Sequence, residues 1–130
     1  MKALPATVEP TLRTLLGQVT TVLGVGVDLE CDRRPNFAMG RFFLAPEELQ
    51  WVQACGEGQQ PDELLRLWTC KEALFKANPA NGGRLLIDHL LLDPAATIGA
   101  GACRFAEDIL FRYASIAVAN GYCTFAVAGR

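Results

Sequence analysis

The residues best suited to chemistry in this 130-residue sequence are acids and lysines in two short motifs about forty residues apart. Residues 24–30 read GVGVDLE, which places Asp28 and Glu30 two positions apart at the end of an apolar run. Residues 68–76 read WTCKEALFK, which places Glu72 between Lys71 and Lys76. Three carboxylates with flanking ammonium groups suit a hard divalent cation that holds a phosphate ester. We therefore expect metal-assisted chemistry on a phosphorylated substrate.

The first motif is predicted to lie on a strand and the second on a helix. Residues 19–29 are rich in valine and threonine, which favours a strand, so the two acids at 28 and 30 should leave it on the same face. Two such carboxylates repel each other unless a cation or a proton intervenes. On the helix, Glu72 and Lys76 are four residues apart and share a face, whereas Lys71 is rotated by about 100° and flanks it.

Each of these residues also has an ordinary structural interpretation. The Glu72–Lys76 pair alone is typical of a solvated helix surface and contributes about 0.2–0.5 kcal/mol. Residues 28–30 alone could be the polar end of a strand, and Glu47 alone could be a first-turn acid that interacts with the helix dipole. The only histidine, His89, is more typical of a structural or surface position than of a catalyst. Only the conjunction of the motifs favours a functional site.

The remaining patterns predict an α+β fold, an antiparallel sheet with helices from the middle of the chain packed on one face. The Asn120-Gly121 dipeptide between two β-rich runs is a strong hairpin signal. Helical patterns cover residues 10–17, 37–43, 46–52 and 61–77, and further strand patterns cover residues 88–92, 100–105, 111–119 and 122–128. We divide the chain into an N-terminal segment with a short helix, residues 1–21, and one domain, residues 22–130.

Composition excludes several classes of protein. A formal net charge of −2 gives no electrostatic reason to expect nucleic-acid binding. No apolar stretch approaches the roughly 20 residues of a membrane span, and residues 1–5 do not resemble the start of a signal peptide. The five cysteines are scattered without a C-x-x-C pair, which indicates reduced thiols in a cytoplasmic protein and argues against a structural zinc site.

The two motifs together resemble the paired signature of the 4′-phosphopantetheinyl transferases, G-[VI]-D-[VIL]-E and W-x-x-K-E-[AS]-x-x-K. Residues 41–47, RFFLAPE, resemble the R-F-F-x-x-x-E segment of the surfactin-type branch, and the resemblance spans about residues 22–128. It implies a phosphopantetheinyl transferase-like half-domain. It also implies Mg²⁺-dependent transfer of the 4′-phosphopantetheine arm of coenzyme A to a serine of an acyl or peptidyl carrier protein, with release of adenosine 3′,5′-bisphosphate. The pathway could be fatty-acid, polyketide or peptide biosynthesis.

The resemblance also implies a role for each residue of the motifs. Lys71 and Lys76 would bind the phosphates of the coenzyme, with Lys76 the better candidate and a member of the catalytic set. Glu47 would be the general base for the serine hydroxyl, which it must reach directly or through one water. The residues that would hold Mg²⁺ on the pyrophosphate are Asp28, Glu30 and Glu72.

The length of the chain raises the question of partners. Surfactin-type enzymes have two similar halves, and this sequence resembles only the second. Holo-acyl-carrier-protein synthases have chains of this size and form trimers with sites between subunits. We therefore expect either a homo-oligomer, with a trimer favoured, or a domain completed by neighbours in a larger synthase. The alternative is a non-catalytic half that acts as a structural or carrier-docking module, and a generic metal-dependent phosphoesterase is a third hypothesis.

Overall fold

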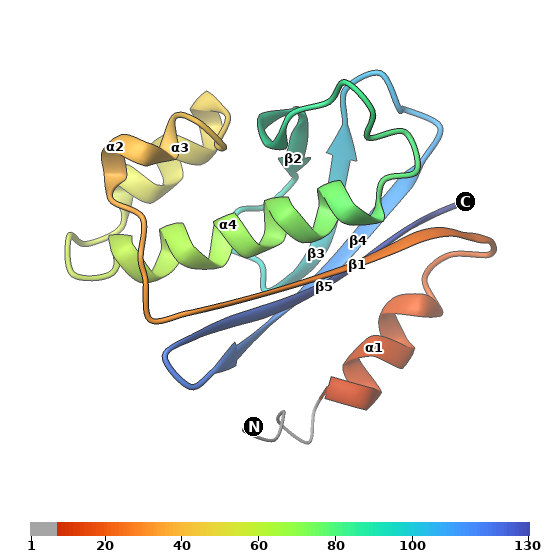
Figure 1. The fold of residues 1–130 in the computed structure, drawn as a ribbon, viewed down its shortest axis with the longest axis horizontal. Coiled ribbons are helices and arrows are strands. Elements are labelled where there is room, and N and C mark those ends of the chain that lie inside the picture. The colour runs from red at the N-terminus through yellow and green to blue at the C-terminus, as the bar shows by residue number, and fades with distance from the viewer. Residues whose placement is uncertain (1–7) are drawn as a thin grey trace.

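The computed structural model describes residues 8–130 and contains one sheet of five antiparallel strands (Figure 1). The order of the strands across the sheet is β1-β5-β4-β3-β2, so β1 and β2 form its edges. The strands are β1 (Val22–Cys31), β2 (His89–Leu91), β3 (Ile98–Cys103), β4 (Leu110–Val118) and β5 (Gly121–Gly129). The expectation concerning a signal peptide at residues 1–5 falls outside the described residues.

The longest helix lies across one face of the sheet and contacts β1, β5 and β4, whereas α1 lies against the other face (Figure 1). The helices are α1 (Val8–Leu16), α2 (Phe37–Gly40), α3 (Pro46–Ala54) and α4 (Gln60–Ala77), and a short 3₁₀ turn covers Leu86–Asp88. The predicted α+β class with an antiparallel sheet is confirmed. Within residues 8–130, no helix is both long and apolar enough to cross a membrane.

The hairpin predicted at the Asn-Gly dipeptide joins β4 to β5, but its turn lies one residue earlier than the dipeptide suggests. Val118 pairs with Gly121, so residues 119 and 120 make the connection, and Asn120 adopts a φ of 58°. Gly121 already belongs to β5, where a Cβ atom would lie 1.9 Å from the carbonyl oxygen of Glu30 on β1. This glycine therefore permits close approach of two strands rather than a turn conformation.

Two glycines allow α4 to lie directly against β1. Gly24 and Gly26 precede the two acids of β1 on the same face of the strand, because alternate residues share a face. A Cβ atom at position 24 would lie 2.0 Å from the carbonyl oxygen of Ala77, and one at position 26 would lie 2.2 Å from that of Ala73. The missing side chains thus bring the backbones of strand and helix together, and the acids that follow are held beside the end of α4.

We expect Gly26→Ala to push α4 away from β1. The new methyl group meets helix backbone, which cannot yield as a flexible side chain can. The expected loss is about 1–3 kcal/mol of unfolding free energy, the usual cost of overpacking. Chemical denaturation would measure it. Gly58→Ala is the matched control, because no atom lies within 4 Å of the added Cβ, and its stability should change by less than about 0.5 kcal/mol. Equal effects of the two substitutions would contradict the proposed close packing.

The core lies between α4 and the sheet, where leucines of α4 pack against aromatic residues of β4 such as Phe111. A cluster of buried polar side chains from α4, β4 and β5 interrupts this apolar layer. The Thr69 hydroxyl lies 2.8 Å from that of Thr124 on β5, and the Cys70 thiol lies 3.0 Å from the Ser115 hydroxyl on β4. These hydrogen bonds satisfy side chains that would otherwise be costly to bury, and they tie α4 to the two central strands.

Candidate active site

The first motif and the end of the second meet at the crossing of β1 and α4. The Nζ atom of Lys76 lies 3.0 Å from Oδ1 of Asp28 and 3.1 Å from the carbonyl oxygen of Val27. The side chain of Asp28 is only 9% exposed. Its second oxygen, Oδ2, is buried and has no hydrogen-bond partner among the residues that the structure describes. A buried carboxylate oxygen without a partner is costly, so it marks a place where a ligand could bind.

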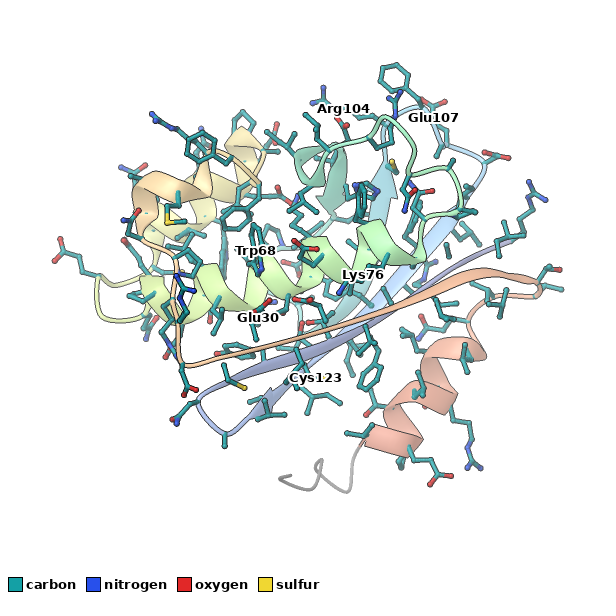
Figure 2. All side chains as sticks on the ribbon, viewed as in Figure 1. Glu30, Trp68, Lys76, Arg104, Glu107 and Cys123 are labelled. Atoms are coloured by element: carbon teal, nitrogen blue, oxygen red, sulfur yellow. The ribbon has the colours of Figure 1, made fainter. Side chains whose placement is uncertain are left out.

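Glu72 belongs to the same group of charges. Burial raises the pKa of its carboxyl group, and the negative charges of Asp28 and Glu30 raise it further, while Lys76 lowers it. Trp68, Glu72 and Lys76 follow one another at four-residue intervals along α4. Figure 2 shows Trp68 and Lys76 on this helix, with Glu30 on the strand that runs beside it. The structure therefore brings the three predicted metal ligands and one of the two lysines into one region.

The chemistry of these carboxylates suits a divalent cation, although their side chains are not arranged as a complete set of metal ligands. Within residues 8–130, no three His, Cys, Asp or Glu side chains converge as a metal site. Asp28 nevertheless offers a buried oxygen without a partner among the described residues, beside Glu72, whose pKa is raised by burial and then by neighbouring negative charge. A cation would satisfy that oxygen and reduce the repulsion. Mg²⁺ typically takes one or two carboxylates and completes its coordination with waters and substrate phosphates.

Lys71 lies apart from this group, in the interior. Its side chain is 0% exposed, and its Nζ atom lies 2.6 Å from Oε1 of Glu48, whose side chain is 3% exposed. The ammonium also donates to the carbonyl oxygen of His89. Glu48 accepts two further hydrogen bonds, from the backbone N–H groups of Ala45 at 2.7 Å and Leu91 at 2.9 Å. This buried ion pair joins α3, α4 and β2, and it leaves the ammonium of Lys71 without access to a phosphate.

Burial lowers the pKa of Lys71, and the neighbouring charge of Glu48 opposes that shift. Sequence patterns alone do not distinguish Glu48 from Glu47 as the interior residue, because both acids fit the first turn of a helix. The structure places Glu47 on the exposed side of α3. No hydrogen bond or ion pair joins its carboxylate to another residue in the described part of the chain. Glu47 is therefore open to a substrate, but it is not held against the other acids.

A groove of about 470 Å³ lies beside Glu30 and was not predicted from the sequence. Apolar side chains dominate its lining, including Met39, Phe42 and Trp68, and Arg33 is also part of the wall. The rings of Phe43 and Trp68 meet edge to face, with centroids 5.1 Å apart. The sequence signal that could have revealed the groove is the pair of adjacent phenylalanines at 42 and 43. In the structure Phe42 is highly exposed. An apolar groove next to acidic groups suits a substrate with an uncharged arm.

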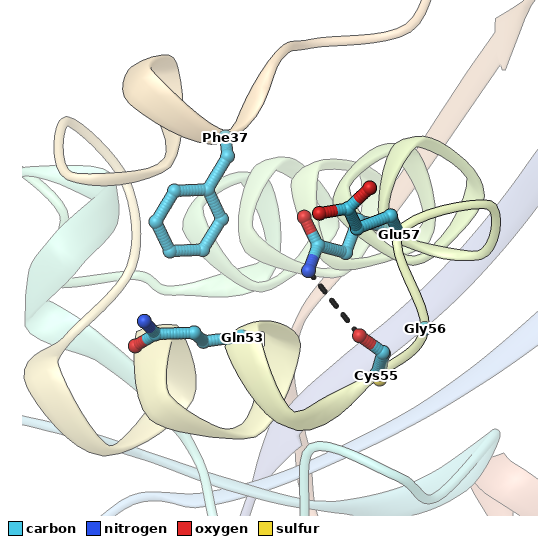
Figure 3. A pocket seen from close by; sticks show the side chains of 6 residues that line it. Phe37, Gln53, Cys55, Gly56 and Glu57 are labelled. Atoms are coloured by element: carbon cyan, nitrogen blue, oxygen red, sulfur yellow. Dashed lines mark hydrogen bonds between the residues drawn. The ribbon is translucent and has the colours of Figure 1, made fainter.

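A second hollow, of about 630 Å³, is lined by Phe37 of α2, by Gln53 of α3 and by residues up to the start of α4 (Figure 3). The Gln60 side chain donates to the carbonyl oxygen of Cys55 there, at 3.2 Å. Glu57 is the only carboxylate in its lining. None of the predicted site residues contributes to it, so we do not assign it a part in the chemistry.

His89 has a structural role, in keeping with one of the two positions expected for it. Its ring is buried, Nδ1 donates to the carbonyl oxygen of Leu85 at 2.9 Å, and Nε2 accepts from the Asn78 amide at 3.0 Å. Burial lowers its pKa, so the imidazole is neutral near pH 7. Both ring nitrogens are engaged, which leaves neither for proton transfer.

Comparison with known families agrees with this arrangement of strand, helix and acids. The sequence model of the 4′-phosphopantetheinyl transferase superfamily matches residues 24–122. The chain belongs to this superfamily. The matched segment begins at the first glycine of β1 and ends within β5, so it includes both motifs and the segment between them. Among curated proteins, no sequence matches the chain.

Membership in the superfamily indicates a transferase of the phosphopantetheinyl kind. The physical arrangement is compatible with such chemistry. Phosphoryl transfer depends on alignment and on neutralisation of charge more than on covalent catalysis. A group of carboxylates with one accessible ammonium, next to an apolar groove, provides the charged and uncharged surfaces that a phosphate ester with a long arm requires.

Proposed function

We propose that the protein transfers the 4′-phosphopantetheine arm of coenzyme A to a serine of a carrier protein, in a reaction that requires Mg²⁺, and so acts as a holo-acyl-carrier-protein synthase. The observation that carries this proposal is the buried, unpartnered Oδ2 of Asp28 beside Glu72 and Lys76. Asp28, Glu30 and Glu72 would hold Mg²⁺, which when bound would polarise the pyrophosphate and stabilise the leaving phosphate.

The side chains of this chain have separate tasks in the proposed reaction. The ammonium of Lys76, which is 47% exposed, would bind a phosphate oxygen of the donor. Glu47, exposed on α3, would accept the proton of the carrier serine directly or through one water. The groove beside Trp68 would accommodate the uncharged part of the arm. Lys71 has no contact with the donor in this proposal, because its ammonium is bound to Glu48 in the interior.

Intact-mass spectrometry tests the proposal directly. The protein is incubated with coenzyme A, Mg²⁺ and several apo carrier proteins, and we expect a phosphopantetheine adduct on at least one carrier. Omission of Mg²⁺, with a chelator present, should prevent the adduct. Absence of the adduct on every carrier, with a sample shown to be folded by circular dichroism, would contradict the proposal.

We further propose that a second copy of this chain completes the coenzyme site, with a trimer as the favoured assembly. The edge strand β1 supports association of copies, because Val25, Val27 and Leu29 are exposed on its face opposite Asp28 and Glu30. Such a row of apolar side chains is typical of a surface that another chain covers. Light scattering at the concentration of the transfer assay should give the mass of an oligomer, and an active monomer would contradict the proposal.

The five free cysteines support the reducing cytoplasm as the proposed location.

A non-catalytic, carrier-docking half-domain remains the second candidate. The observation that favours it is that the acids of residues 8–130 do not converge as a metal site. Calorimetry with coenzyme A separates the two candidates. Binding that requires Mg²⁺ would favour the transferase, whereas carrier binding without coenzyme binding would favour the docking module.

A further inference from the structure

Among the described residues, Lys76 provides the only ammonium or guanidinium group that contacts Asp28, Glu30 or Glu72. It contacts Asp28, the carboxylate at which a metal ion would bind. Its ammonium lies 3.0 Å from Oδ1 of Asp28 and 3.1 Å from the carbonyl oxygen of Val27, both on β1. The side chain extends from the last turn of α4 and is about half exposed. Because its stem is long and partly solvated, the ammonium can leave β1 without unfolding anything.

A metal ion and this ammonium cannot both bind Asp28 without mutual cost. Mg²⁺ lies about 2.0–2.1 Å from its oxygen ligands. An ion on either oxygen of this carboxylate would therefore lie within roughly 7 Å of the Lys76 ammonium as it stands, and within roughly 5 Å if it were on Oδ1. At such a separation near a protein surface, repulsion between like charges changes affinity by about tenfold or more. The contact that neutralises Asp28 in the structure thus opposes the binding of a metal ion at the same carboxylate.

We propose that Lys76 is a built-in competitor of the metal ion at Asp28, and that a phosphate-bearing donor removes this competition by taking the ammonium for itself. The proposal rests on the proposed function, since it assigns the donor's phosphate to Lys76. Its consequence is coupling between the two ligands. A donor that draws Lys76 away from Asp28 strengthens metal binding, and by reciprocity the metal strengthens donor binding by the same factor. The site is therefore assembled by both ligands together.

Mn²⁺ binding to wild-type protein and to Lys76→Met tests the competition, with calorimetry or the electron paramagnetic resonance of Mn²⁺ as the readout. Without any donor, we expect Lys76→Met to bind Mn²⁺ about tenfold or more tightly than wild type. Lys76→Arg keeps the charge and should behave as wild type does. Arg13→Met is the control for net charge, because Arg13 pairs with Glu9 on α1, on the other face of the sheet. It should leave Mn²⁺ affinity unchanged. Equal or weaker binding by Lys76→Met would overturn the proposal.

A second measurement adds coenzyme A to wild-type protein and to Lys76→Met. Coenzyme A should tighten Mn²⁺ binding by wild type in two ways, because its phosphates coordinate the metal and also draw Lys76 away from Asp28. In Lys76→Met only the first effect remains, so coenzyme A should tighten Mn²⁺ binding by wild type about tenfold or more beyond its effect on the variant. Absence of Mn²⁺ binding by any variant would also overturn the inference. These readouts do not depend on transfer. If the protein shows the coupling but modifies no carrier, the inference stands and the proposed function is wrong. If the protein modifies a carrier but wild type and Lys76→Met bind Mn²⁺ with equal affinity, the proposed function stands and the inference is wrong.

Discussion

Replacing Lys71 by methionine should lower the free energy of unfolding by about 3–5 kcal/mol, because it leaves the Glu48 carboxylate in the interior without its counter-ion. Glu48 would keep two backbone hydrogen bonds, from Ala45 and Leu91, but these do not neutralise its charge. The carbonyl oxygen of His89 would lose its donor as well. Thermal or chemical unfolding monitored by circular dichroism would measure the loss.

The two lysines of the second motif offer a matched comparison for this prediction. Lys76→Met removes an ion pair whose lysine is about half exposed, so its expected cost is at most about 1 kcal/mol. The double variant Glu48→Met, Lys71→Met removes both charges and should recover part of the stability lost in the single variant. Similar small losses for both lysines would show that Lys71 is not part of a buried pair. The resemblance alone would have led to that expectation, since it assigns both lysines to the coenzyme.

Replacing Asp28 by asparagine should separate activity from stability. We expect the rate of carrier modification to fall by at least about a hundredfold, since charge stabilisation by a metal ion at its ligands contributes several kcal/mol to such a reaction. The unfolding free energy should change by less than about 1 kcal/mol, because the one ion pair that Asp28 makes within residues 8–130 involves a half-exposed lysine. The substitution also removes repulsion between Asp28 and Glu72. Time courses by intact mass and thermal unfolding give the two readouts.

Asp32→Asn is the control for this substitution. Asp32 is exposed just beyond β1 at a φ of 71°, a conformation that asparagine also tolerates. It should change neither activity nor stability. If Asp28→Asn lost stability in proportion to activity, Asp28 would be a structural residue and the proposed metal site would be wrong.

The sequence predicted the elements better than it predicted the direction of individual side chains. Alternation and end signals identified the strand of the first motif, the helix of the second and the closing hairpin, because these depend on local periodicity and on proline, glycine and asparagine. They could not determine which of two neighbouring side chains points into the interior, as for Glu47 and Glu48 or for Lys71 and Glu72. In each pair one side chain points inward and the other outward, and the choice depends on which element packs against the helix.

The sequence patterns also did not reveal why α4 can lie so close to β1. Gly24 and Gly26 read as interruptions of a valine-rich strand, and only the position of the Ala73 and Ala77 carbonyl groups explains them. The groove beside Trp68 depends on residues from β1, α2 and α4 that are distant in sequence. Such surfaces arise from tertiary packing, so single-sequence patterns carry little information about them.

The buried pair of Glu48 and Lys71 also determines the rotational phase of α4. Lys71 and Glu72 are consecutive, so rotating the helix by one residue would place the carboxylate of Glu72 against that of Glu48 in a dry interior. Two like charges there would be far more costly than the native arrangement of opposite charges. The pair thus rejects neighbouring rotations of the helix that an apolar contact of similar size would tolerate. The residue that faces the interior thereby determines where its neighbour points at the surface.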